Sequence, residues 1–307
     1  MRPNGGLCNL TEVVVRADDT PETLKEKVRL ATILGTMQAT LTDFHFVGES
    51  WTRNAKEEAL LGVSMTGIMD NQLTSGKKGH EVLAEVLEEL RDYTFEVNAE
   101  WADKIGIRRA AAVTTNKPSG TVSQLTNSAS GIHARHSQYY LRTVRTDKKD
   151  PLYQFMMSKG IYCEDDVMKP DTGAVFYFPI KAPEGSVVTT DRCAIEQLEL
   201  WLLYQRHWTH HKPSVTINVE DGEWMEVGAW VWKHFDEVSG VSFLPGSGGH
   251  SYRQAPYQTV TKEEYDEWVA KHPMPAIDWS ELSEFEKEDT TVGMQTLSCT
   301  AGVCEIA

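Results

Sequence analysis

The sequence predicts an α/β fold in which helices cover a mostly parallel sheet. Short runs of β-branched and small apolar residues alternate along the chain with longer segments whose apolar residues recur at helical spacing. Strands that alternate with helices pair in parallel, because each helix returns the chain to the same end of the sheet. Such sheets bind ligands at the carboxyl ends of their strands, so we expect functional residues there.

The first part of the chain is expected to contain two strands and three helices. Thr20 followed by Pro21 is typical of a helix start, and apolar residues keep a helical period from there to Phe44. A small apolar run that ends in Gly67 indicates the second strand. The predicted elements are a strand over 7–15, helices over 20–44 and 54–60, a strand over 61–67 and a helix over 81–105.

The second part continues the alternation. A helix capped by Asp191 carries apolar residues from Ile195 to Leu202. The other predicted elements are strands over 139–145, 174–178, 214–219 and 241–244, and helices over 152–158, 223–235 and 262–270. The periodicity is lost from about Pro273, so we expect a folded body over residues 1–272 and a flexible tail over residues 273–307.

The stretch over residues 110–123 is the central candidate for a ligand site. Ala111 to Val113 suit a crowded strand, while Pro118 and Gly120 end it and let the backbone approach a ligand. A turn that opens a helix offers unpaired N–H groups, and hydroxyls with Lys117 nearby favour phosphate. An ordinary capped turn without a ligand explains the pattern equally well. The candidate phosphate-binding residues are Pro118, Ser119, Gly120, Thr121, Val122 and Ser123.

The charge and composition limit the partners. Lysine and arginine are outnumbered 30 to 45 by aspartate and glutamate, which gives a net charge of −15. A protein that grips duplex nucleic acid presents a basic face, so we expect no such partner. There is no apolar run long enough to cross a membrane and no signal segment at Met1, which predicts a cytoplasmic location.

The five cysteines differ in their expected roles. An odd number without a signal argues against a secreted disulfide framework, and Cys163 and Cys193 are interpreted as packing residues. Cys299 and Cys304 are separated by four residues and can form a disulfide that exchanges with another one when the tail moves. The alternative is half of a zinc site, but no second close pair completes it. Cys8 would then be the cysteine inside the site with which the tail pair exchanges its disulfide.

Two histidine patterns are expected to have no metal or cofactor role. Residues 43–48 match the Asp-x-His-x-x-Gly pattern of cobalamin-binding mutases, but they follow a helix rather than a strand, which indicates a chance match. His207, His210 and His211 have no carboxylate placed to complete a metal set, and a helix end favours histidine through its dipole. We predict no metal site.

Four segments in the right order carry a family resemblance. They are Gly-Leu-Cys-Asn-Leu-Thr-Glu-Val at 6–13, Leu-Leu-Gly-Val-Ser-Met-Thr-Gly-Ile-Met-Asp at 60–70, Pro-Ser-Gly-Thr-Val-Ser at 118–123 and the terminal Cys-x-x-x-x-Cys. Together they resemble the C-terminal part of adenosylcobalamin-dependent (class II) ribonucleoside-triphosphate reductases, over almost the whole chain. The resemblance implies the second half of a ten-stranded α/β barrel with an internal finger loop.

The resemblance also implies roles for individual residues. Cys8 would be one of two cysteines that reduce the ribose of a ribonucleoside triphosphate to the 2′-deoxy form, and residues 118–123 would bind the substrate phosphates. Cys299 and Cys304 would regenerate the active-site dithiol with electrons from a thioredoxin-type reductant. Adenosylcobalamin would be the cofactor that generates a thiyl radical.

One motif of the family is absent from this sequence. The finger loop carries Asn-x-Cys-x-Glu, whose cysteine becomes the thiyl radical, and Cys163-Glu164 lacks the asparagine. We therefore expect a C-terminal polypeptide, made separately or left after interruption of a longer gene, that works only with the N-terminal half. The alternatives are a large-subunit fragment of a reductase with a separate radical subunit and a non-catalytic nucleotide-binding remnant. The intact tail cysteines argue against the remnant.

Overall fold

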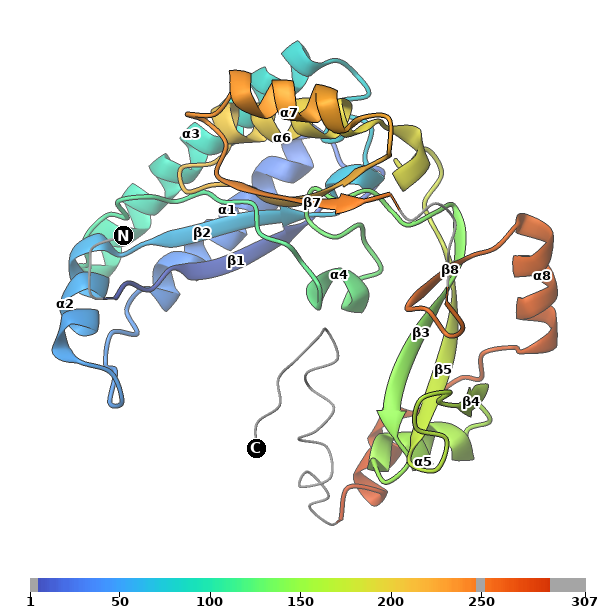
Figure 1. Ribbon diagram of the computed structural model, residues 1–307. Coiled ribbons are helices and arrows are strands. Elements are labelled where there is room, and N and C mark those ends of the chain that lie inside the picture. Colours follow the sequence, from blue (N-terminus) through green and yellow to red (C-terminus); the bar gives the residue numbers. More distant parts are fainter. Residues whose placement is uncertain (1–4, 247–251, 288–307) are drawn as a thin grey trace. The chain divides into compact units, whose positions relative to one another are not determined.

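The computed structural model describes residues 5–246 and 252–287, and it divides them into two units (Figure 1). The parallel unit comprises residues 5–135 and 182–246, and the antiparallel unit comprises residues 136–181 and 252–287. The expected boundary at residue 272 therefore falls inside the second unit. No helix in these ranges is long and apolar enough to cross a membrane.

The parallel unit is built on two strand pairs joined by an extended segment. β1 (Asn9–Val14) pairs in parallel with β2 (Leu61–Thr66), and β6 (Ser214–Val219) pairs in parallel with β7 (Gly240–Pro245). Residues 111–116 run between β2 and β6, because Val63 N–H donates to the Val113 carbonyl and Ser214 N–H donates to the Asn116 carbonyl, both at 2.8 Å. The expected parallel sheet is thus present in this unit, although residues 111–116 make isolated bridges rather than a regular strand.

Helices cover one face of this sheet. In Figure 1, α1, α3, α6 and α7 lie above the strands, whereas α4 lies below them. The helices are α1 (Pro21–Gln38), α2 (Glu49–Glu58), α3 (His80–Ile105), α4 (Val122–Leu125), α6 (Ala194–His207) and α7 (Trp224–Lys233), with short 3-10 turns η1 (Ile68–Asp70) and η2 (Thr189–Asp191). Cys193 rather than Asp191 precedes α6, because Asp191 ends η2.

The two faces of the sheet differ in character because successive strand residues point to opposite sides. Val13, Val63 and Ile217 face the helices and are almost fully buried in the core with Leu24 of α1 and Trp201 of α6. The other residues of each strand face away from the helices, and we call this side the open face. It carries Cys8, Leu10, Glu12, Gly62, Ser64, Thr66, Thr115 and Lys117.

β1 lies at an edge of this sheet. Within the described ranges β1 pairs only with β2, so its other edge is unpaired. Leu30 and Leu34 of α1 are 62% and 61% exposed, and Met37 on the next turn is 45% exposed. A groove of about 440 Å³ between β1 and α1 is lined by Leu10, Leu30 and Leu34 among others. The edge strand and the neighbouring helix thus present apolar surface to solvent.

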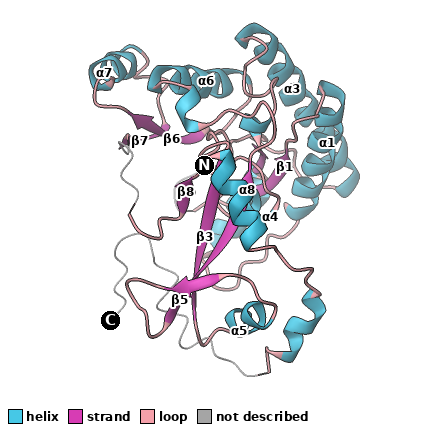
Figure 2. Ribbon diagram, turned by 90° about the vertical axis from the view of Figure 1, so that its right-hand side faces the viewer, coloured by secondary structure: helices cyan, strands magenta, loops and turns pink. Residues whose placement is uncertain are grey.

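The antiparallel unit corrects the expectation of a uniformly parallel sheet. Its strand order is β4-β5-β3-β8, and every neighbour is antiparallel; Figure 2 shows β3 and β5 side by side. Its elements are β3 (Tyr139–Asp147), α5 (Pro151–Ser158), β4 (Cys163–Asp165), β5 (Gly173–Lys181), β8 (Tyr257–Thr259), α8 (Lys262–Lys271) and the 3-10 helix η3 (Trp279–Glu284).

A carboxylate network ties this unit together. Glu164 of β4 accepts hydrogen bonds from the Tyr162 hydroxyl at 2.8 Å, the Tyr177 hydroxyl at 2.9 Å and the Gln254 amide at 3.2 Å. Burial alone would raise the pKa of the Glu164 carboxyl, but these three hydrogen bonds hold it below its usual range. Glu164 therefore joins β4, β5 and the segment before β8 as an ionised acceptor.

Part of the predicted tail is folded. The Trp279 and Phe285 rings lie 5.6 and 5.5 Å from the ring of Phe155 in α5, so residues 279–285 cover an apolar cluster of this unit. Residues 273–287 are exposed or half-buried, as expected of a tail, but Trp279–Glu284 form η3 and residues 279–285 pack against α5, because scattered aromatic residues contact Phe155 here without helical spacing. Cys299 and Cys304 lie outside the described residues.

Candidate functional site

Cys8 lies directly before β1 on the open face of the parallel unit. A Cβ placed on Gly62 of β2 would come within 2.9 Å of Cys8 Sγ, so glycine at this position makes room for the thiol. The thiol is free, and burial raises its pKa to about 11. Cys8 is therefore protonated at neutral pH in the described structure.

His211 is a titratable neighbour of Cys8, and no local sequence pattern pairs the two residues. Its Nε2 lies 3.8 Å from Cys8 Sγ and 2.7 Å from the Leu61 carbonyl oxygen. Nε2 must carry a hydrogen to bond that carbonyl, so it cannot accept the thiol proton at the same time. The other two histidines lie elsewhere: His207 bonds Glu88, and His210 lies against the Phe95 ring.

The predicted phosphate-binding residues form an exposed turn on the same face. Pro118, Gly120 and Thr121 are exposed, Val122 is half-buried, and Ser119 and Ser123 are buried. Nothing lies within 4 Å of the place where Gly120 would carry a Cβ. The N–H groups of Gly120, Thr121 and Val122 donate to no acceptor in the described part of the chain. These three N–H groups lie at the exposed part of the turn and are available to a ligand.

Three of the features that favoured phosphate in the sequence have other partners in the structure. Ser123 Oγ donates to the Ser119 carbonyl, and Ser119 Oγ donates to a Glu12 carboxylate oxygen at 2.8 Å. Lys117 Nζ lies 3.2 Å from the other Glu12 oxygen. The helix that follows, α4, has only four residues, so it contributes little dipole. The expected unpaired backbone donors are thus present in the turn, whereas the Ser119 and Ser123 hydroxyls and Lys117 have protein partners.

A second loop, residues 127–135, supports the turn from behind. Ser130 Oγ accepts from Ser119 N–H at 3.2 Å and donates to the Ser119 carbonyl at 3.0 Å. His133 Nδ1 donates to the Ser130 carbonyl at 2.9 Å, and its Nε2 accepts from Thr216 N–H of β6 at 3.0 Å. Burial lowers the pKa of His133, which keeps it neutral as these two bonds require. The loop thereby connects the turn to the sheet.

A buried ion pair holds this loop in place. Arg135 Nε and Nη2 each lie 2.8 Å from an oxygen of Asp70, and both side chains are 3% exposed. Asp70 also accepts from Ala129 N–H at 2.8 Å and from the Ser186 hydroxyl at 3.2 Å. Because every oxygen is satisfied, this pair fixes loop geometry. No sequence pattern predicted a site role for Glu12, Asp70, Ser130, His133 or Arg135; the turn-forming run Asn127-Ser128-Ala129-Ser130-Gly131 indicates only a loop.

Glu12 connects the two predicted parts of the site. It lies on β1 four residues after Cys8, on the same face, and its carboxylate contacts Lys117 and Ser119 of the turn. Four residues of strand span about 13 Å. The structure thus brings Cys8 and the turn onto one face. Cys163 is half-buried and Cys193 is exposed, so the packing role expected for Cys193 is wrong.

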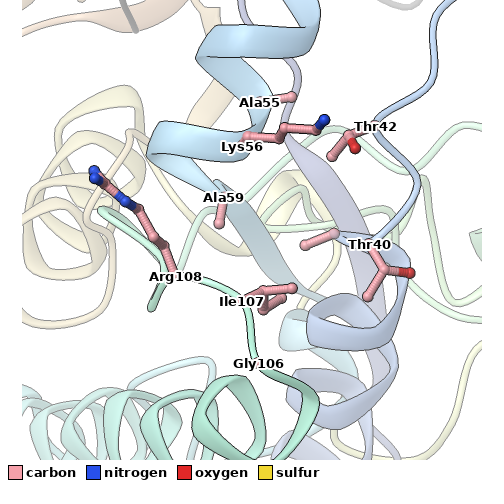
Figure 3. Close-up of a pocket in the computed structure, with 9 residues that line it drawn as sticks. Thr40, Thr42, Ala55, Lys56, Ala59, Gly106, Ile107 and Arg108 are labelled. Atoms are coloured by element: carbon pink, nitrogen blue, oxygen red, sulfur yellow. The ribbon is translucent and has the colours of Figure 1, made fainter.

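A more basic cavity lies at the other end of the parallel unit and suits an anion less well. It measures about 350 Å³ and is lined by Lys56, Arg108 and the residues that end α1, α2 and α3, namely Ala39, Ala59 and Gly106. Figure 3 shows Lys56 reaching toward Thr42 and Arg108 pointing away from the other labelled side chains. Three helix C-termini converge here, and their carbonyl ends attract cations and repel anions. The two cations offset these dipoles.

Comparison with known proteins confirms the resemblance. No family model matches the chain. The chain is 30% identical over 268 residues to the adenosylcobalamin-dependent ribonucleoside-triphosphate reductase of Euglena gracilis, covering 86% of this chain and 36% of that protein. It is 26% identical over 335 aligned residues to the enzyme of the same name from Lactobacillus acidophilus, covering 99% of this chain and 44% of that protein. The chain thus spans less than half the length of these relatives.

A solved structure supports the same fold. A crystal structure of a B12-dependent (class II) ribonucleotide reductase matches with a TM-score of 0.77 at 22% identity, over 92% of this chain and 42% of that one. The α/β fold class is thereby confirmed.

The described residues do not form a site that fits a cobalamin. The two cavities described in the parallel unit, of about 350 and 440 Å³, are each too small for a corrin with its nucleotide loop. His45 of the Asp-x-His-x-x-Gly pattern is 74% exposed and lies 3.5 Å from Asp43. Within residues 5–246 and 252–287, no group of three or more histidine, cysteine or acidic side chains is placed to hold a metal ion.

Proposed function

We propose that this chain is part of the catalytic polypeptide of an adenosylcobalamin-dependent reductase that converts ribonucleoside triphosphates to 2′-deoxyribonucleotides. The observation that supports it best is that Cys8 and the 118–123 turn, the two parts to which the resemblance gives roles, lie on the same face of the sheet. A substrate whose phosphates contact the turn extends its sugar along β1 toward the thiol.

Cys8 acts as one of two thiols that reduce the ribose. The 2′-hydroxyl leaves as water while two thiols become a disulfide, so two electrons and two protons pass from sulfur to the substrate. A thiol with a pKa of about 11 keeps its proton until the reaction uses it, which suits a hydrogen donor.

The substrate phosphates accept hydrogen bonds from the turn. The free N–H groups of Gly120, Thr121 and Val122 point to an anion that approaches the backbone closely. The loop held by Asp70 and Arg135 keeps the turn in this conformation.

The chain requires the remainder of the reductase, on the same or another polypeptide. Parallel sheets are normally covered by helices on both faces, whereas the open face of this unit carries Cys8 and is covered over Ser64 and Thr66 by the turn and the 127–135 loop rather than by a layer of helices. The Asn-x-Cys-x-Glu motif that would form the thiyl radical is absent. We propose that the N-terminal half covers this face and supplies the radical cysteine, the second reducing thiol and the cobalamin site.

Cys299 and Cys304 return electrons to the active site in this proposal. They lie outside the described residues, so the proposal rests on their spacing and on the family resemblance. A thioredoxin-type protein reduces the tail pair, which then exchanges with the disulfide that contains Cys8.

Reconstitution tests the proposal. The chain is mixed with a polypeptide that carries the N-terminal half of a related reductase, and deoxynucleotide formation is measured with adenosylcobalamin and thioredoxin. The chain alone should give no product, the mixture should turn over, and Cys8→Ser should abolish even the first turnover. With Cys299 and Cys304 both changed to serine, one turnover from prereduced protein should remain, and a small dithiol should restore later ones.

The same assay separates the alternatives. Activity of the purified chain by itself would contradict the need for the N-terminal half. Triphosphate binding without turnover in any mixture would favour the nucleotide-binding remnant.

A further inference from the structure

Glu12 has an incomplete set of partners at the edge of the turn. Its side chain is 6% exposed, and one carboxylate oxygen accepts from the Ser119 hydroxyl at 2.8 Å. The other oxygen accepts no hydrogen bond from the described residues, although Lys117 Nζ lies 3.2 Å away. A nearly buried carboxylate normally has all its oxygens bonded, so this one is poorly satisfied.

The contacts of Glu12 are the groups that a phosphate would use. Lys117 is the cation of the turn, and Ser119 carries a hydroxyl directly before the free N–H groups. While Glu12 holds both, the turn offers backbone donors but no uncompensated charge. A phosphate that entered would meet the Glu12 carboxylate unless Lys117 and Ser119 changed partner.

We propose that Glu12 is a specificity-determining residue that competes with the bound phosphate for Lys117 and Ser119. This inference rests on the proposed role of the turn as a phosphate site. A ligand binds only if its phosphate attracts Lys117 and Ser119 more strongly than Glu12 does, so the turn favours highly charged polyphosphates over singly charged anions. Glu12 also weakens the complex, because binding leaves its carboxylate without partners, and this limits product retention.

The test measures binding of inorganic tripolyphosphate to the chain by isothermal titration calorimetry. Glu12→Gln keeps the shape and the acceptor for Ser119 but releases Lys117. We expect this variant to bind tripolyphosphate about tenfold more tightly, or about 1.4 kcal/mol. Glu89→Gln is the matched control: it makes the same change in net charge at the exposed Lys25–Glu89 pair and should leave the affinity within twofold.

A double-mutant comparison isolates the competition. Lys117→Met should weaken binding only a few-fold in the original chain, because Glu12 already offsets the ammonium charge. The same substitution should remove the entire gain in the Glu12→Gln background. Such non-additivity is expected only if Glu12 and the bound phosphate compete for Lys117.

The outcomes distinguish the two proposals. One set of results would contradict the role of Glu12 alone: the chain binds tripolyphosphate, Gly120→Trp abolishes this binding, and Glu12→Gln raises the affinity no more than Glu89→Gln does. The turn would then remain the phosphate site. If neither the chain nor Glu12→Gln binds tripolyphosphate, both proposals fail. Unfolding midpoints within a few degrees of the unchanged chain verify that each variant is folded.

Discussion

The two units use a carboxylate side chain in opposite ways. In the antiparallel unit, Glu164 accepts three hydrogen bonds from neutral donors and joins strands. In the parallel unit, Glu12 has one hydroxyl, one ammonium at 3.2 Å and one oxygen without a hydrogen bond. Asp70, also in the parallel unit, is fully satisfied. Glu164 and Asp70 are fully bonded and hold strands and loops together, whereas Glu12 at the candidate site keeps one oxygen without a hydrogen bond.

The largest effect is expected at the Asp70–Arg135 pair. Arg135→Met leaves a carboxylate that is 3% exposed without its cation and should lower the free energy of unfolding by about 3–5 kcal/mol. Lys117→Met removes a partly exposed cation that makes no hydrogen bond to Glu12, so it should cost less, about 1–2 kcal/mol. Urea unfolding of both variants, followed by tryptophan fluorescence, measures the difference. Equal losses would remove the distinction between the two carboxylates.

Cys8 should react slowly in the folded chain. With its pKa near 11, against about 8.5 for an unperturbed thiol, alkylation by iodoacetamide at pH 8 should be on the order of a hundredfold slower than in the unfolded chain. The rate should rise about tenfold per pH unit toward pH 11. Peptide mass spectrometry gives the rate, with exposed Cys193 as the internal reference. A fast reaction at pH 8 would mean that the thiol is not buried as described.

The Glu164 network should make the antiparallel unit sensitive to acid. Its folded-state pKa lies below the unfolded value, so its contribution is fully present above the unfolded pKa of about 4.3 and is lost as the pH falls through the folded pKa. Glu164→Gln should cost about 1–3 kcal/mol at pH 7 and should reduce the loss of stability between pH 5 and pH 3. Urea unfolding at these pH values tests both effects. An unchanged acid sensitivity would show that another carboxylate controls it.

The smallest expected change in the free energy of unfolding distinguishes two glycines of the turn region. Gly131 has φ +56°, and a Cβ there would come within 2.7 Å of the Lys117 carbonyl oxygen, so Gly131→Ala should cost about 1–2 kcal/mol. Gly120 has open space, and Gly120→Ala should change stability by less than about 0.5 kcal/mol. Thermal unfolding of the two variants measures both changes. A similar loss at Gly120 would mean that the turn needs its glycine for folding rather than for a ligand.

The sequence was a good guide where apolar spacing decides structure. Val13, Val63 and Ile217 alternate as strand residues should, and α1, α3 and α6 show a helical period, so the parallel unit was predicted element by element. β4 and β8 were missed because each has only three residues and is defined by its antiparallel partner, which for β8 is β3, more than a hundred residues earlier in the chain. Such short strands have no period of their own.

The candidate site was only partly predictable. Pro118 and Gly120 identified the turn because their backbone chemistry is local. The contacts of Cys8 with His211 and of Asp70 with Arg135 join residues 203 and 65 positions apart, and no local pattern encodes such pairs. The hydrogen bond between Glu12 and Ser119, which are 107 positions apart, could not be predicted for the same reason.

The unpaired edge of β1 and the exposed Leu30 and Leu34 beside it affect how the chain can be prepared. An open strand edge next to apolar side chains is a template for aggregation, because another copy can add its own strand there. Expressed alone, the chain should lose solubility as its concentration rises, despite a net charge of −15. Co-expression with a polypeptide that covers this edge should raise the soluble yield before any activity is measured.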